Sequence, residues 1–98
     1  MEIGYRSRSI EKICTDATVA EKKYGLEMAE KIQLRVEQIS AAESVEMMVQ
    51  CHIGRCHQLK GKRKKQWAVD LVHPYRLVFT KKGEEIEFAY ILEIVDYH

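Results

Sequence analysis

Apolar residues in the first half of the chain recur at spacings of three and four, which is typical of amphipathic helices. The segment SRSIEKIC offers a serine as N-cap, and Asp16 can cap the segment that follows, up to a break at Gly25. Residues 26–39 then predict a longer amphipathic helix. The opening MEIGY is expected to be a short strand, and ESVEMMVQ a short helix or loop.

The second half of the chain changes to alternation of period two, which predicts strands in QWAVDLV, YRLVFT and IEFAYILEIV. Turn signals at His73-Pro74 and around Gly83 separate them, so two consecutive hairpins are expected. Arg76 lies on the polar side of its strand. The predicted apolar sides are Trp67, Val69 and Leu71; Tyr75, Leu77 and Phe79; and Ile86, Phe88, Tyr90, Leu92 and Ile94.

This order predicts one α+β domain over residues 1–98: an N-terminal strand and two to three helices on one face of a small, mainly antiparallel, twisted sheet. No apolar run is long enough for a membrane span, and MEIGYRSRS has no apolar core of a signal peptide. Three cysteines fit a reducing compartment better than a disulfide framework. We therefore expect a cytoplasmic protein with no membrane association.

Charge is distributed unevenly, although the net charge is only +1. Residues 51–82 carry nine basic side chains against Asp70 alone. Such an excess is a footprint for a polyanion, and a solvated protein face is the plain alternative. The densest part is LKGKRKK, where Gly61 would let a phosphate backbone approach closely. Its basic residues are Lys60, Lys62, Arg63, Lys64 and Lys65.

Arg76 and the end of the chain supply groups for chemistry. A guanidinium can stabilise the extra negative charge of a phosphorus transition state through two parallel hydrogen bonds. Imidazole titrates near neutral pH and can accept and return a proton. Acid–base candidates are His57, Asp96, Tyr97 and His98.

The segment CHIGRCH raises the alternative of a metal site, because Cys51, His52, Cys56 and His57 could supply four ligands. Structural zinc sites place their second ligand pair far along the chain, whereas these four residues lie within seven positions. We therefore expect no metal. No phosphate-binding glycine motif or nucleophile elbow is present, so the sequence gives no support for a nucleotide cofactor or for serine hydrolysis.

The stretch CHQLKGKRKKQWAVDLVHPYRLVF and the closing DYH resemble the HigB branch of the RelE/ParE toxin superfamily, the plasmid maintenance killer proteins. That resemblance covers residues 56–98, and the N-terminal half matches only in character. Gln58 stands where the family often has proline. The resemblance implies a type II toxin that cuts mRNA in the ribosomal decoding site. It also implies a helix-turn-helix antitoxin of the HigA type, through which alone operator DNA would be contacted, and no cofactor.

By this resemblance, Lys60 and Arg76 would contact the scissile phosphate, and Lys62 and Arg63 would grip the RNA backbone. His57, Asp96, Tyr97 and His98 would supply proton transfer and substrate positioning. Without a metal, RNA can be cleaved by its own 2′-OH, and this requires a base, an acid and a cation. The division of base and acid between the residues stays open. The alternatives are a ParE-like toxin that inhibits DNA gyrase without catalysis and a basic partner in an antitoxin–DNA complex.

One geometric expectation opposes a joint site. If the second hairpin turned at Gly83, Arg76 would pair near position 90, and His98 would lie up to ~26 Å further along an extended strand. Alternation would also put Asp96 and His98 on the apolar side of the sheet unless a bulge resets it.

Overall fold

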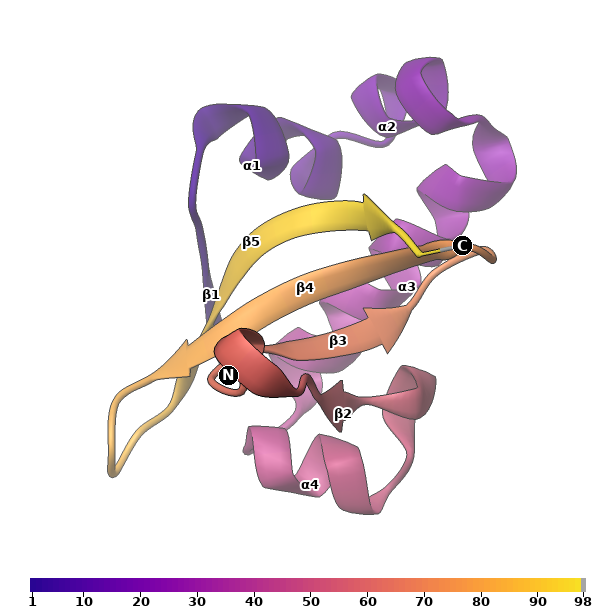
Figure 1. The fold of residues 1–98 in the computed structure, drawn as a ribbon. Helices are drawn as coiled ribbons and strands as arrows, with labels where there is room; N and C mark the ends of the chain where they lie inside the picture. The colour runs from indigo at the N-terminus through magenta and orange to yellow at the C-terminus, as the bar shows by residue number, and fades with distance from the viewer. Residues whose placement is uncertain (98) are drawn as a thin grey trace.

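A five-stranded sheet forms one layer of the molecule, and helices cover one of its faces (Figure 1). The computed structural model describes residues 1–97. The strand order is β1-β5-β4-β3-β2, with β1 parallel to β5 and the other neighbours antiparallel. The strands are β1 (Glu2–Tyr5), β2 (His57–Gln58), β3 (Trp67–Asp70), β4 (Tyr75–Lys82) and β5 (Phe88–Asp96). The predicted N-terminal strand and the two hairpins are confirmed.

The helical layer contains more helices than the two or three expected. Asp16 ends the first helix and caps the second, since its Oδ1 accepts hydrogen bonds from the backbone N–H groups of Thr18 (3.0 Å) and Val19 (3.4 Å). The segment ESVEMMVQ is helical. The α-helices are α1 (Arg8–Thr15), α2 (Ala17–Tyr24), α3 (Leu26–Ala41) and α4 (Val45–Gln50), and the 3₁₀ turns are η1 (Ile53–Arg55) and η2 (Gly61–Arg63).

The hydrophobic core lies between the helices and one face of the sheet. Ile32 and Ile39 of α3 pack with Leu77 and Phe79 of β4, and all four are almost fully buried. The rings of Tyr24 and Tyr75 meet edge to face, with centroids 5.5 Å apart. The predicted inward faces of QWAVDLV and YRLVFT are therefore confirmed. None of the helices within residues 1–97 is both long and apolar enough to cross a membrane.

The register of the second hairpin differs from the sequence expectation. Lys82 pairs with Phe88, so the loop covers residues 83–87 and is centred two positions later than Gly83. Between Phe79 and Val78 the partner changes from Ile91 to Glu93, so Leu92 is the extra residue of a β-bulge. As a result, Arg76 lies opposite Val95 and not opposite position 90. The expected separation between Arg76 and the end of β5 was wrong.

The predicted inward face of the last strand is wrong for the residues before the bulge. Ala89 and Ile91 are buried against the helices, whereas Ile86 and Phe88 are exposed, Ile86 by 86% and Phe88 by 37%. Beyond the bulge, Ile94 packs on the core, as predicted. The alternation alone could not place this face, because both phases of IEFAYILEIV contain apolar residues.

Candidate functional site

Arg76 lies on the face of the sheet that α1–α4 leave open. Directly opposite residues of antiparallel strands share a face, and Arg76 is opposite Asp70 on β3 and Val95 on β5. The helix-facing residues on either side of it are Tyr75 and Leu77. The sequence prediction that Arg76 points away from the core is therefore confirmed.

Two contacts hold the Arg76 side chain in place. Its Nε lies 3.4 Å from Oδ1 of Asp70, and its guanidinium carbon lies 4.9 Å from the centroid of the Tyr97 ring. The Tyr97 backbone N–H donates to the carbonyl of Pro74 (3.0 Å), which fixes Tyr97 beside the start of β4. Arg76 is thus a positioned cation with 28% of its side chain exposed, and not one that extends freely into solvent.

Arg63 connects η2 to the last strand. Its Nη1 donates to the Tyr97 hydroxyl (3.0 Å), its Nε donates to Gln66 (2.8 Å), and its Nη2 lies 3.5 Å from a carboxylate oxygen of Glu93. All three guanidinium nitrogens therefore have partners within the chain. This side chain packs over the open face, where it helps to hold Tyr97 to the basic turn formed by residues 60–65.

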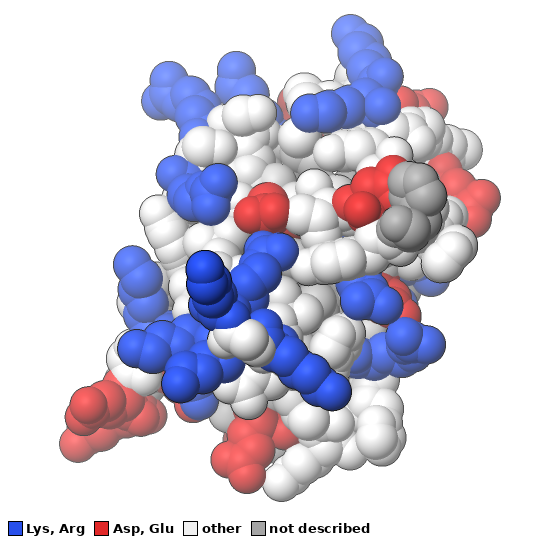
Figure 2. Space-filling model, viewed as in Figure 1, with Lys and Arg blue, Asp and Glu red and all other residues white. Residues whose placement is uncertain are grey.

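The four lysines of the basic turn point outward. Lys60, Lys62, Lys64 and Lys65 are exposed, and within residues 1–97 their ammonium groups have neither hydrogen bonds nor ion pairs. Figure 2 shows lysine and arginine side chains gathered over η2, in front of β4, while acidic side chains gather at the tip of the β4–β5 hairpin. Such a positively charged surface is typical of proteins that bind a polyanion.

The other predicted acid–base groups are placed differently. His57 shares the open face with Ala68, and strand spacing and rise put its Cα roughly 12 Å from that of Arg76. Its Nδ1 lies 2.9 Å from the Arg55 carbonyl, so Nδ1 is the donor and a neutral His57 accepts at Nε2. Asp96 is opposite Tyr75 and so belongs to the helix-facing side. His98 lies outside the described residues.

The segment CHIGRCH forms a turn and a 3₁₀ helix after α4, and its last residue, His57, begins β2. Cys56 is buried and Cys51 is exposed, and burial raises the pKa of the Cys56 thiol to about 11. No group of three or more potential metal ligands occurs among residues 1–97.

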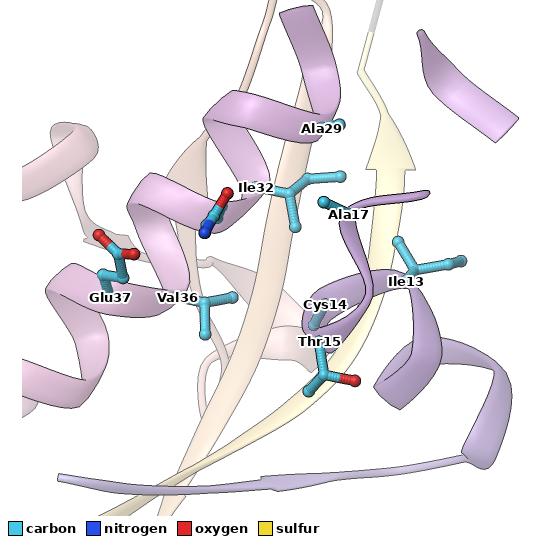
Figure 3. A pocket seen from close by; sticks show the side chains of 9 residues that line it. Ile13, Cys14, Thr15, Ala17, Ala29, Ile32, Val36 and Glu37 are labelled. Carbon is cyan, nitrogen blue, oxygen red and sulfur yellow. The ribbon is translucent and has the colours of Figure 1, made fainter. Parts of the chain in front are cut away.

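A separate cavity of about 350 Å³ lies in the helical layer between α1 and α3 (Figure 3). Its walls include the apolar side chains of Ile13, Ile32 and Val36, with Glu37 at the side. Burial raises the pKa of the neighbouring Cys14 thiol from 9.0 to about 12, so this thiol stays protonated at neutral pH. The cavity therefore offers no ionised nucleophile and lies across the sheet from Arg76.

Sequence reasoning did not single out Asp70, Glu93 or Arg55 as parts of the site. Asp70 holds Arg76 and also pairs with Arg55, whose Nε lies 2.8 Å from Oδ2. Asp70 is the one acidic residue among nine basic ones in residues 51–82, and this isolation was a sequence signal that it pairs with basic side chains. Nothing in the sequence marked Glu93, which faces outward because of the bulge beside it.

A scan against protein-family models finds no match for this chain, and no curated protein matches it. Among solved structures, its fold is similar to that of the YoeB/ParE toxin from Agrobacterium tumefaciens, with a TM-score of 0.68 over 100% of both chains. The chain is thus a small α+β protein with the toxin-like fold of the YoeB/ParE type. At 14% sequence identity, the likeness concerns the fold and does not select the HigB branch.

Proposed function

We propose that the chain is the toxin of a type II toxin–antitoxin system, of the HigB branch, and that it cleaves mRNA in the decoding site of the ribosome. The observation that carries this proposal is the contact of Arg76 with Tyr97 on the open face, beside a turn with four exposed lysines. A fixed guanidinium next to a basic surface suits a phosphate of a single RNA strand.

In the proposed reaction, the 2′-hydroxyl oxygen of one nucleotide attacks the adjacent phosphorus. The bond from phosphorus to the 5′-oxygen of the next nucleotide breaks, leaving a 2′,3′-cyclic phosphate and a 5′-hydroxyl. A base removes the 2′ proton, and an acid protonates the leaving oxygen. Arg76, with Lys60, stabilises the added negative charge on the phosphoryl oxygens.

Several residues are candidates for the proton transfers. His98 is the leading one, because it is the imidazole that follows Tyr97 in the sequence. His57 can accept at Nε2, and the Tyr97 oxygen accepts from Arg63, which leaves its own proton for another acceptor. Asp96 would act from the strand end by positioning the substrate. Lys62, Lys64 and Lys65 would bind the RNA backbone, and Arg63 would orient Tyr97.

The proposed partners follow from this role. The cytoplasmic ribosome would align the mRNA, and a helix-turn-helix antitoxin of the HigA type would silence the toxin. Operator DNA would be contacted through the antitoxin. No cofactor enters the proposed reaction.

The test is expression of the wild type, Arg76→Ala and a chain lacking His98, with growth and mRNA integrity measured together. The wild type is expected to stop growth and to cut mRNA when ribosomes are present. Both variants are expected to fold, by circular dichroism, and to leave mRNA intact. Growth arrest with intact mRNA and induction of DNA damage signalling would instead favour a gyrase-directed toxin.

A further inference from the structure

A cavity of about 210 Å³ opens beside Arg76, where β3 ends and β4 begins. Its lining includes Arg55, Asp70, His73, Arg76 and Tyr97. Two guanidinium groups, one imidazole and one carboxylate are thus gathered around a space that Tyr97 also lines. Nothing in the sequence had linked Arg55 to this place.

Arg55 reaches the cavity from a strained backbone. Arg55 and His52 both have left-handed conformations, with φ of 53° and 55°, which residues other than glycine rarely adopt. Such strain persists where the surroundings enforce it, and it often accompanies binding sites. Here the Arg55 side chain is tied to Asp70, with 2.8 Å between Nε and Oδ2.

Asp70 is itself fixed, and it holds both arginines at once. The Nε of Arg35 donates to the Asp70 carbonyl (2.6 Å), which anchors the end of β3. The two carboxylate oxygens of Asp70 then face Arg55 and Arg76 separately. The two guanidinium groups are therefore held on the two oxygens of one carboxylate.

We propose that this cavity is a second phosphate subsite for single-stranded RNA, in which Arg55 binds the phosphodiester next to the one held by Arg76. This inference rests on the proposed function, because it places the same RNA strand. The terminal nitrogens of Arg55 have no recorded partner within residues 1–97, and 73% of its side chain is exposed. A guanidinium can use two of its donors on a phosphate while Nε stays on Asp70.

Charge favours this occupant over a neutral one. The two arginines exceed Asp70 by one positive charge, and the lysine surface of η2 extends along the same open face. Fixed cations that are already ordered by a carboxylate lose little conformational freedom when an anion binds. Asp70 thus acts as a positioning residue for both cations.

The test uses a fluorescent 2′-O-methyl uridine tetranucleotide, which cannot be cleaved through its 2′ position. Its affinity for the full chain is measured by anisotropy between about 50 and 200 mM salt. Loss of one single-strand phosphate contact is expected to reduce the slope of log K against log salt by about 0.7 in Arg55→Gln. Arg55→Lys should keep the slope and lose part of the affinity, because lysine keeps the positive charge but lacks the paired N–H donors of a guanidinium.

Two further variants separate binding from support. Arg8→Gln removes the same charge from an exposed position on α1 and should leave the slope unchanged. Asp70→Asn keeps both cations and removes only the carboxylate that positions them, so affinity should fall while the salt slope stays that of the wild type. If Arg55 merely supported Arg76 through Asp70, Arg55→Gln would also lose affinity with an unchanged salt slope, and this result would overturn the subsite.

The subsite and the proposed function can fail separately. A wild type that does not bind the tetranucleotide at low salt, or an Arg55→Gln variant with unchanged slope and affinity, would overturn the subsite. Binding that depends on Arg55 in a protein that leaves ribosome-bound mRNA intact would support the subsite and contradict the cleavage.

Discussion

Arg63 and Lys62 are adjacent residues with the same charge and different surroundings. Arg63 contacts Gln66, Tyr97 and Glu93, whereas the Lys62 ammonium is exposed and unpaired within residues 1–97. We expect Arg63→Gln to lower both cleavage and the free energy of unfolding, the latter by about 1–2 kcal/mol, because hydrogen bonds to charged groups are lost. Urea denaturation and a ribosome cleavage assay measure the two effects.

Lys62→Gln is the matched control. It should leave the unfolding free energy within about 0.5 kcal/mol of the wild type, since exposed substitutions rarely exceed this. Equal unfolding free energies for Arg63→Gln and the wild type would show that Arg63 does not hold η2 to β5.

Cys14 gives a prediction about pH. Its pKa is raised from 9.0 to about 12 by burial, so above pH 9 the unfolded chain binds fewer protons than the folded one. The free energy of unfolding should therefore fall as pH rises from about 9 toward 11, by up to about 1.4 kcal/mol per pH unit from this thiol. Cys14→Ala should show a shallower fall, and the exposed Cys51→Ala should not. Identical slopes in urea denaturation would contradict the buried thiol.

The sequence predicted single residues well where one local rule decides them. Alternation around Arg76 was sufficient to place it away from the core, because Tyr75, Leu77 and Phe79 form a clear apolar side. Its partners were not predictable, since Asp70 lies on β3 and Tyr97 follows β5, the strands on either side of β4. The residues were visible in the sequence, but their convergence depends on register.

Gly83 begins the loop that sets this register, and its backbone is left-handed, with φ of 89°. A Cβ at this position would collide with the carbonyl oxygen of Ile86. We expect Gly83→Ala to be destabilising by both strain and this clash. Gly61 also has a positive φ, of 68°, but a Cβ there would meet nothing within 4 Å.

Gly61→Ala is thus the control for strain alone, which costs about 1–2 kcal/mol. Gly83→Ala should lose more unfolding free energy than Gly61→Ala in urea denaturation. Equal losses would indicate that the loop adapts without a clash.

The arrangement of β5 explains why elements were predictable and their pairing was not. Period-two alternation locates a strand in IEFAYILEIV, but it says nothing of an extra residue within it. The bulge at Leu92 moves every later residue by one position and brings Tyr97 beside Arg76. Bulges depend on contacts between strands, which a single sequence does not encode locally.

The whole molecule divides its two faces between packing and charge. Helices and the apolar cavity occupy one side of the sheet, and the lysines in and around η2 lie on the other (Figures 1 and 2). We expect the triple change of Lys62, Lys64 and Lys65 to Gln to weaken RNA binding and to reduce the slope of its salt dependence, because three cations leave the face that is proposed to bind RNA.

The control is the same change at Lys12, Lys22 and Lys23, which removes three charges from α1 and α2. Anisotropy with the tetranucleotide should separate the two variants. Equal weakening by both would mean that net charge, and not the face around Arg76, attracts RNA.

The central claim is that Arg76 stabilises a phosphate during attack by the neighbouring 2′-OH. The most direct measurement is the mapping and chemistry of new mRNA 5′ ends after purified protein is added to translating ribosomes. The account predicts cuts by the wild type that carry a 5′-hydroxyl, and a reduction of about 100-fold or more in Arg76→Ala. New ends that carry a 5′-phosphate, or equal cutting by Arg76→Ala, would contradict it.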